Sequence, residues 1–127
     1  MQLDLMDSPR QYLQFIKDVD REGVGVHMDL VNMIVSPYRY THIRELIDES
    51  FSLLGGWIRS CHIKDCLLPL GANVVIQEVP VGTGNMDISY YLQKIAALQG
   101  DIPVLFEHMN ELEDYDEPFR YVRGLIG

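Results

Sequence analysis

Three side chains of the kinds that bind metals or move protons lie near the ends of short apolar stretches. Asp29 closes "VGVHMD", His62 lies within "SCHIKD", and Glu107 interrupts the apolar run "VLFEHM". Two carboxylates and one imidazole are ligands that suit a divalent ion such as Mn²⁺, Mg²⁺, Co²⁺ or Zn²⁺. Burying such groups together is unfavourable unless a cation or a hydrogen-bond network compensates them. The three residues therefore predict a shared site, provided that the fold brings them together.

Helices and strands that could position these residues alternate along the chain. Ser8 as an N-cap followed by Pro9 predicts a first helix, and Thr41 begins a second helix that Gly55 and Gly56 end. Asp87 is expected to cap a third helix, which ends near Gly100. A last helix begins around residues 113–118, and it is expected to bury Phe119, Val122 and Ile126.

Strands are predicted at residues 24–29, 57–65 and 103–109, with a further β-like piece in "NVVIQEV" and a break at "SPYRY". The order is therefore helix, strand, helix, strand, helix, strand, helix. This alternation favours an α/β fold with about three parallel strands, four helices and right-handed crossovers. One domain is expected over residues 1–127.

Side chains of a strand alternate between its two faces, so each predicted strand has one apolar face. The other face carries His27 and Asp29 in the first strand, His62 and Lys64 in the second, and Glu107 in the third. Parallel strands bring their C-terminal ends to one edge of the sheet. Asp29, His62 and Glu107 are therefore predicted to meet at that edge.

Each of these residues also has a structural interpretation. A strand-end carboxylate such as Asp29 often caps a turn or helix, and His27 is of a type more often found satisfied in a core. "VGTG" before the third helix could receive a phosphate, although a tight turn explains it more simply. Cys61 and Cys66 are best interpreted as reduced core thiols, because Cys61 belongs to the apolar face.

Composition narrows the classes of function. The net charge of −9 disfavours a nucleic-acid partner, whose phosphates demand a basic face. No apolar run is long enough for a membrane span, and the N-terminus does not have the pattern of a secretory signal. With two cysteines and no second pair, a reducing cytoplasmic location is the simplest expectation.

Four motifs carry a resemblance to a known family. "VGVHMDLVNMIVSP", "SCHIKD", "EVPVGTGNMDISYYLQKI" and "IPVLFEHM" resemble the C-terminal half of the xylose isomerase-like TIM barrels, the sugar phosphate isomerase and epimerase group. The resemblance covers nearly the whole chain. It implies a partial (β/α) barrel whose chemistry lies at the C-terminal ends of its strands.

The resemblance also implies residue roles. The family holds one divalent metal with Glu, Asp, His and Glu from successive strands, and Asp29, His62 and Glu107 match the last three ligands. Glu107 would also match a glutamate that moves the proton next to a metal-polarised carbonyl. Asn32, Lys64 and His27 are the predicted contacts to a sugar or sugar phosphate.

The sequence departs from the family pattern at three places. No strand ending in the first ligand glutamate precedes Ser8. Asn32 stands where tagatose-type epimerases have a histidine, and Leu68 stands where they have an arginine. An incomplete barrel is expected to associate, as a homo-oligomer or with a separate N-terminal half.

Two alternatives to an isomerase or epimerase remain at this stage. The chain could be a non-catalytic remnant, or a binding or structural module of the same fold. An apurinic endonuclease-like hydrolase is less favoured, because the additional Asp-x-His pair of those enzymes is missing from the sequence.

Overall fold

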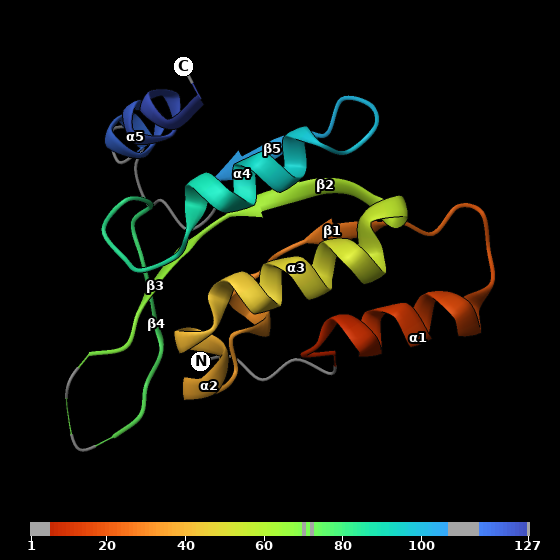
Figure 1. The fold of residues 1–127 in the computed structure, drawn as a ribbon, viewed down its shortest axis with the longest axis horizontal. Coiled ribbons are helices and arrows are strands. Elements are labelled where there is room, and N and C mark those ends of the chain that lie inside the picture. Colours follow the sequence, from red (N-terminus) through yellow and green to blue (C-terminus); the bar gives the residue numbers. More distant parts are fainter. Residues whose placement is uncertain (1–5, 70, 72, 107–114, 127) are drawn as a thin grey trace.

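Three parallel strands form the centre of the molecule. The structure is a computed structural model, and it describes residues 6–69, 71, 73–106 and 115–126. Within these ranges β1 (Val26–Met28), β2 (Ile58–Ile63) and β5 (Val104–Phe106) lie in the order β1-β2-β5 (Figure 1). Both pairings are parallel. The predicted parallel sheet is therefore present, with β1 and β2 shorter than predicted, while residues 107–109 of the third predicted strand lie outside the described residues.

The helices follow the predicted capping signals. The four longer helices of the described residues are α1 (Pro9–Val19), α3 (Ile43–Leu54), α4 (Ile88–Ala96) and α5 (Asp116–Ile126). The Ser8 side chain caps α1 by accepting a hydrogen bond from the backbone N–H of Gln11. The Asp87 side chain caps α4 by accepting one from the backbone N–H of Tyr90. Each cap satisfies a backbone donor that the first helical turn leaves without an intrahelical partner.

One face of the sheet is covered by α3 and α4, while α1 packs beside α3 (Figure 1). Val26, Met28, Cys61 and Ile63 are buried on this face, as the alternation of apolar residues predicts. Leu46, Ile47 and Ile88 of the covering helices are fully buried as well. This face holds the hydrophobic core, and it fixes which way every strand residue points.

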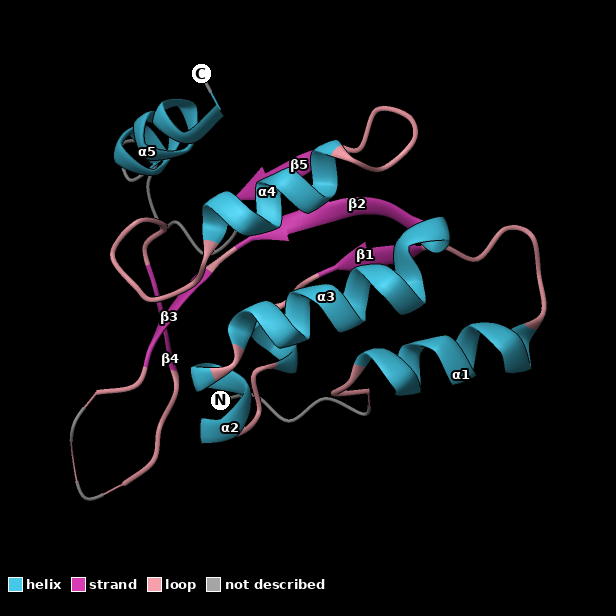
Figure 2. Cartoon of the chain, in the orientation of Figure 1, coloured by secondary structure: helices cyan, strands magenta, loops and turns pink. Residues whose placement is uncertain are grey.

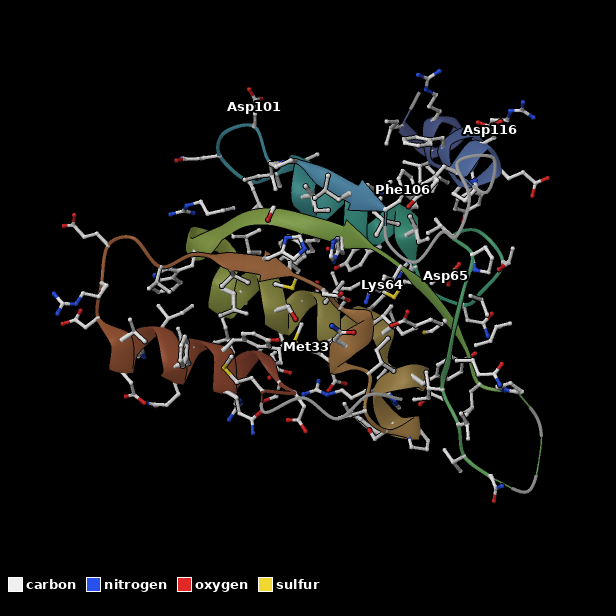
Figure 3. All side chains as sticks on the ribbon, turned by 180° about the vertical axis from the view of Figure 1, so that it is seen from behind. Met33, Lys64, Asp65, Asp101, Phe106 and Asp116 are labelled. Carbon is white, nitrogen blue, oxygen red and sulfur yellow. The ribbon has the colours of Figure 1, made fainter. Side chains whose placement is uncertain are left out.

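The opposite face carries His27, Ser60, His62 and Leu105, and we call it the bare face. His27 is exposed, and 49% of Leu105 is accessible to solvent. In the described part of the chain no helix lies over this face when the molecule is seen from behind (Figure 3). Of the residues predicted to do chemistry, His27 and His62 thus lie on this face.

A second sheet projects beyond the C-terminal end of β2. It pairs β3 (Asp65–Leu67) with β4 (Gln77–Val79) in antiparallel fashion (Figure 2). The β-like piece predicted within "NVVIQEV" is confirmed as β4. Because β3 starts two residues after β2 ends, this ribbon continues the path of β2 away from the parallel sheet.

Two predictions about helices are wrong. "SPYRY" does not simply break the chain, because Ser36 caps a short helix, α2 (Pro37–Thr41), by accepting the N–H of Arg39. Helix α3 then starts at Ile43 instead of Thr41.

The prediction for the last helix holds only in part. Val122 is buried in α5, but Phe119 is exposed and Ile126 is 66% exposed. The apolar spacing therefore identified the helix, whereas part of its apolar surface stays exposed in the described structure, although the Phe119 ring contacts Phe106. In the described ranges no helix combines the length and the apolarity needed to cross a membrane.

Candidate metal site at the strand ends

Strands β1 and β2 place two histidines together on the bare face. The register sets His27 opposite Ser60, and the rings of His27 and His62 stand edge to face with their centroids 4.0 Å apart. His27 Nδ1 and Ser60 Oγ share a hydrogen bond. The interpretation of His27 as a buried core residue is wrong, because it points away from the helix-covered face.

Asp29 lies where β1 gives way to the 3-10 helix η1 (Val31–Met33). Its Oδ1 accepts a hydrogen bond from the backbone N–H of Asn32 at 3.4 Å, so the carboxylate does cap this turn. Its Oδ2 lies 3.3 Å from His62 Nδ1. The capping role and the predicted approach to His62 therefore occur in the same side chain, one on each oxygen.

Lys64 reaches the same carboxylate from the end of β2. Its Nζ lies 2.8 Å from Asp29 Oδ2, and it donates to Asn32 Oδ1 and Glu78 Oε1, each at 3.3 Å. The Lys64 side chain is only 5% exposed. A buried ammonium group is stable only when acceptors replace its hydration, and these acceptors among the described residues do so. Figure 3 shows Lys64 just past the arrowhead of β2.

Asp65, the next residue, is held in a different way. Its Oδ1 accepts the backbone N–H groups of Cys66 and Met86, and its Oδ2 accepts those of Gly82 and Gly84, all between 2.9 and 3.0 Å. Asp65 is 1% exposed. A carboxylate that accepts four backbone amides fixes the loop before α4 against the start of β3.

This contact decides between the two interpretations of "VGTG". The amides of Gly82 and Gly84 that could have bound a phosphate already donate to Asp65, so the motif forms a tight turn. Gly82 has a φ of 95°, a backbone conformation that favours glycine. A Cβ atom on Gly84 would lie 2.3 Å from Asp65 Oδ1 and 2.5 Å from the Cys66 carbonyl oxygen. Sequence reasoning missed Asp65, although an aspartate at the end of a strand before a loop with two glycines was a usable signal.

A buried tyrosine on the helix-covered side of the sheet holds the backbone of the site. The Tyr91 hydroxyl donates to the carbonyl oxygen of His62 at 3.1 Å, which anchors the backbone of β2 at that residue. Burial raises the pKa of Tyr91 well above its ordinary value, so the hydroxyl keeps its proton. Cys61 and Cys66 are free and buried, as predicted. Burial raises the pKa of both thiols, that of Cys66 to about 12.

The donor atoms of Asp29 and His62 fit a shared metal ion. Two ligands of one ion at about 2.1 Å are separated by roughly 3.0–3.4 Å in octahedral or tetrahedral geometry. The 3.3 Å between Asp29 Oδ2 and His62 Nδ1 lies in that range. No group of three or more His, Cys, Asp or Glu with metal-site spacing occurs among the described residues. The third predicted ligand, Glu107, lies outside the described residues.

Comparisons with known proteins identify the fold. No family profile and no curated protein sequence matches the chain. A xylose isomerase domain protein from Planctomyces limnophilus superposes with a TM-score of 0.70 and 25% identity, over 93% of this chain and 43% of that protein. The chain has the fold of part of a xylose isomerase-like TIM barrel.

A second solved structure agrees with the first. A xylose isomerase-like TIM barrel protein from Mycobacterium smegmatis, in complex with magnesium, superposes with a TM-score of 0.66 and 19% identity. The match covers 94% of this chain and 39% of that protein. The chain thus spans less than half the length of the solved structures it matches, and the predicted partial barrel is confirmed.

Proposed function

We propose that the chain is part of a divalent-metal-dependent sugar or sugar-phosphate isomerase or epimerase. The observation that carries the proposal is the 3.3 Å approach of Asp29 Oδ2 to His62 Nδ1 at the ends of adjacent parallel strands. Parallel barrels keep their chemistry at this end. The magnesium in the Mycobacterium smegmatis protein of the same fold supports a divalent ion over other cofactors.

In this proposal Asp29 and His62 bind the ion, and Glu107 is a third ligand that also moves the proton. Glu107 follows directly after Phe106, the last residue of β5, which Figure 3 places at the arrowhead of that strand. The ion, when bound, would polarise a substrate carbonyl and so acidify the neighbouring carbon. Glu107 would remove the proton from that carbon and return it.

Three further residues are proposed to contact the substrate. His27 is exposed beside His62 on the bare face, so it can hydrogen-bond a sugar hydroxyl. Asn32 accepts from Lys64 through Oδ1, which orients its amide nitrogen as a donor. Lys64 supplies positive charge next to Asp29.

We also propose that the barrel is completed by association, with a second copy or with a separate N-terminal half. In the described residues β1 and β5 each pair only with β2, and open strand edges favour pairing with another chain. The exposed Leu105 and Ile126 add apolar surface that association would cover. Light scattering on the purified chain is expected to give at least twice the monomer mass of 14.6 kDa. A monomer at high concentration would exclude a second copy as the partner.

A metal titration tests the central proposal. The chain is expected to bind one Mn²⁺, and Asp29→Asn and His62→Ala are each expected to weaken binding at least about 100-fold, because each removes a direct ligand. His42→Ala is the matched control, since the His42 ring stacks on Tyr38 and contacts Thr41 and the Tyr38 carbonyl.

The second candidate is a binding or structural module without catalysis. It is favoured by the ion pair between Lys64 and Asp29, which satisfies the carboxylate without a metal. In that case Mn²⁺ would not bind, and a chelator would leave the melting temperature unchanged. The two buried free thiols fit a reducing compartment, and we propose the cytoplasm for either function.

A further inference from the structure

Asp29 Oδ2 has two side-chain neighbours, His62 and Lys64, and a bound metal ion would attract the first and repel the second. His62 Nδ1 at 3.3 Å is of a type that can bind an ion together with this oxygen. Lys64 Nζ at 2.8 Å is itself a cation. This contact is also the shortest that Lys64 makes with its three acceptors, as expected for a charge-assisted hydrogen bond.

A metal and the ammonium group would be close neighbours if both kept this oxygen. With a metal–oxygen distance of about 2.1 Å and the observed 2.8 Å to Nζ, the two cations could lie at most about 5 Å apart. Like charges at that distance, with little water between them, repel strongly. Binding of the ion must therefore weaken the hold of Lys64 on Asp29.

Glu78 is an alternative ion-pair partner for the Lys64 ammonium group. Its Oε1 already lies 3.3 Å from Lys64 Nζ, and its side chain is 38% exposed, so it can adjust its position. Glu78 belongs to β4, whose partner strand β3 begins directly after Lys64. A small movement of the ammonium toward Glu78 would keep it paired while freeing Asp29 Oδ2.

We propose that Lys64 is the built-in counter-cation of Asp29 and competes with a divalent ion for its carboxylate, moving toward Glu78 when the ion binds. Lys64 is then a positioning residue: it holds the site together without metal and sets how tightly metal binds. The inference rests on the proposed metal site, and it assigns Lys64 a task separate from contact with substrate.

Opposite effects of two substitutions test the competition. Lys64→Gln keeps hydrogen-bonding groups but removes the charge, and it is expected to tighten Mn²⁺ binding roughly tenfold. Glu78→Gln removes the alternative partner, and it is expected to weaken Mn²⁺ binding several-fold. Lys94→Gln, which removes the charge of a partly exposed lysine paired with Asp48, is the matched control and is expected to change little. Weaker binding in Lys64→Gln would overturn the proposal, since a merely structural lysine gives that result.

A double-mutant cycle on the metal-free chain separates this inference from the proposed function. Asp29→Asn, Lys64→Gln and their combination are compared through their unfolding equilibrium constants in urea, with chelator present. A resident ion pair predicts non-additivity by a factor of roughly 5 to 100. If neither the original chain nor Lys64→Gln binds Mn²⁺, the proposed function fails, and the cycle alone decides whether Lys64 neutralises Asp29. Additive effects would overturn that assignment.

Discussion

Two strand-end aspartates in the same molecule are held by different means. Asp65 accepts four backbone N–H groups of a tight loop, at 2.9 to 3.0 Å. Asp29 accepts one backbone N–H at 3.4 Å, and otherwise faces the side chains of His62 and Lys64. Asp29 follows directly after β1, and Asp65 begins β3 two residues after β2 ends.

The difference separates a structural carboxylate from one that can bind a ligand. Backbone amides around Asp65 are fixed by the fold, so no ion can replace them without unfolding the loop. The side chains around Asp29 can rotate, and one of them is itself a metal ligand by type. Burial alone would not have distinguished the two residues, but the nature of their partners does.

Asp65→Ala is expected to have the largest effect on stability. It would leave four donors without their acceptor in a buried site, and we expect a loss of about 3 kcal/mol or more in the free energy of unfolding. Urea unfolding of the variant checks this. Asp101→Ala, at an exposed position in the loop before β5, is the control and is expected to change stability by less than about 0.5 kcal/mol. Equal effects would show that Asp65 does not anchor the loop.

Gly84→Ala tests the same contact from the side of the loop. The new Cβ would clash with the Asp65 carboxylate and the Cys66 carbonyl oxygen, so the loop must shift at a cost of about 2 kcal/mol. Thermal unfolding measures this loss. Gly56→Ala meets nothing within 4 Å and serves as the control. A variant as stable as the original chain would mean that the loop is not tightly fixed.

Asp29→Asn is expected to have a smaller effect, about 1–2 kcal/mol in the metal-free chain. It weakens the pair with Lys64, but Lys64 keeps Glu78 and Asn32 as acceptors. Unfolding in urea with chelator measures this loss. A loss as large as that of Asp65→Ala would contradict the distinction between the two aspartates.

The reactivity of the buried Cys66 thiol tests how tightly the hydrophobic core is packed. Because burial, helped by nearby Asp65 and Glu78, raises the pKa of Cys66 from 9.0 to about 12, only about one thiol in ten thousand is ionised at pH 8. Thiol reagents are expected to label Cys66 slowly in the native chain and rapidly in urea. Fast native labelling would mean that the core opens readily.

The same shift has a consequence for stability at alkaline pH. The folded-state pKa of Cys66 lies above the unfolded value, so its contribution is complete below about pH 9 and is lost as the pH rises toward 12. The urea midpoint is expected to fall over this window, and less steeply in Cys66→Ala. An identical fall in both chains would assign the effect to other groups.

The sequence predicted those parts of the fold that depend on local periodicity. Alternation placed His27 and His62 on one face and Cys61 on the other, and capping signals located the starts of α1 and α4. Ser36-Pro37 has the same signature as Ser8-Pro9, so α2 could have been predicted. The contact between the two histidine rings was not predicted, because it depends on the β1–β2 register, which shifts between Val26 and His27.

The remaining features depend on contacts between distant segments. The loop amides that bind Asp65 lie 17 to 21 residues further along the chain. The link between Lys64 and Glu78 depends on the β3–β4 pairing, which periodicity does not specify. Phe119 and Ile126 were expected to be buried because their spacing is helical, but spacing does not reveal whether a neighbouring element is present.

Pulsed EPR on the Mn²⁺-loaded chain tests the shared metal site most directly. Direct coordination predicts a nitrogen coupling from the His62 imidazole, which is lost in His62→Gln and retained in His27→Gln, whose ring lies beside it. A nitrogen coupling that survives His62→Gln, or a chain that binds no Mn²⁺ at all, would contradict the assignment of Asp29 and His62 as ligands of one ion.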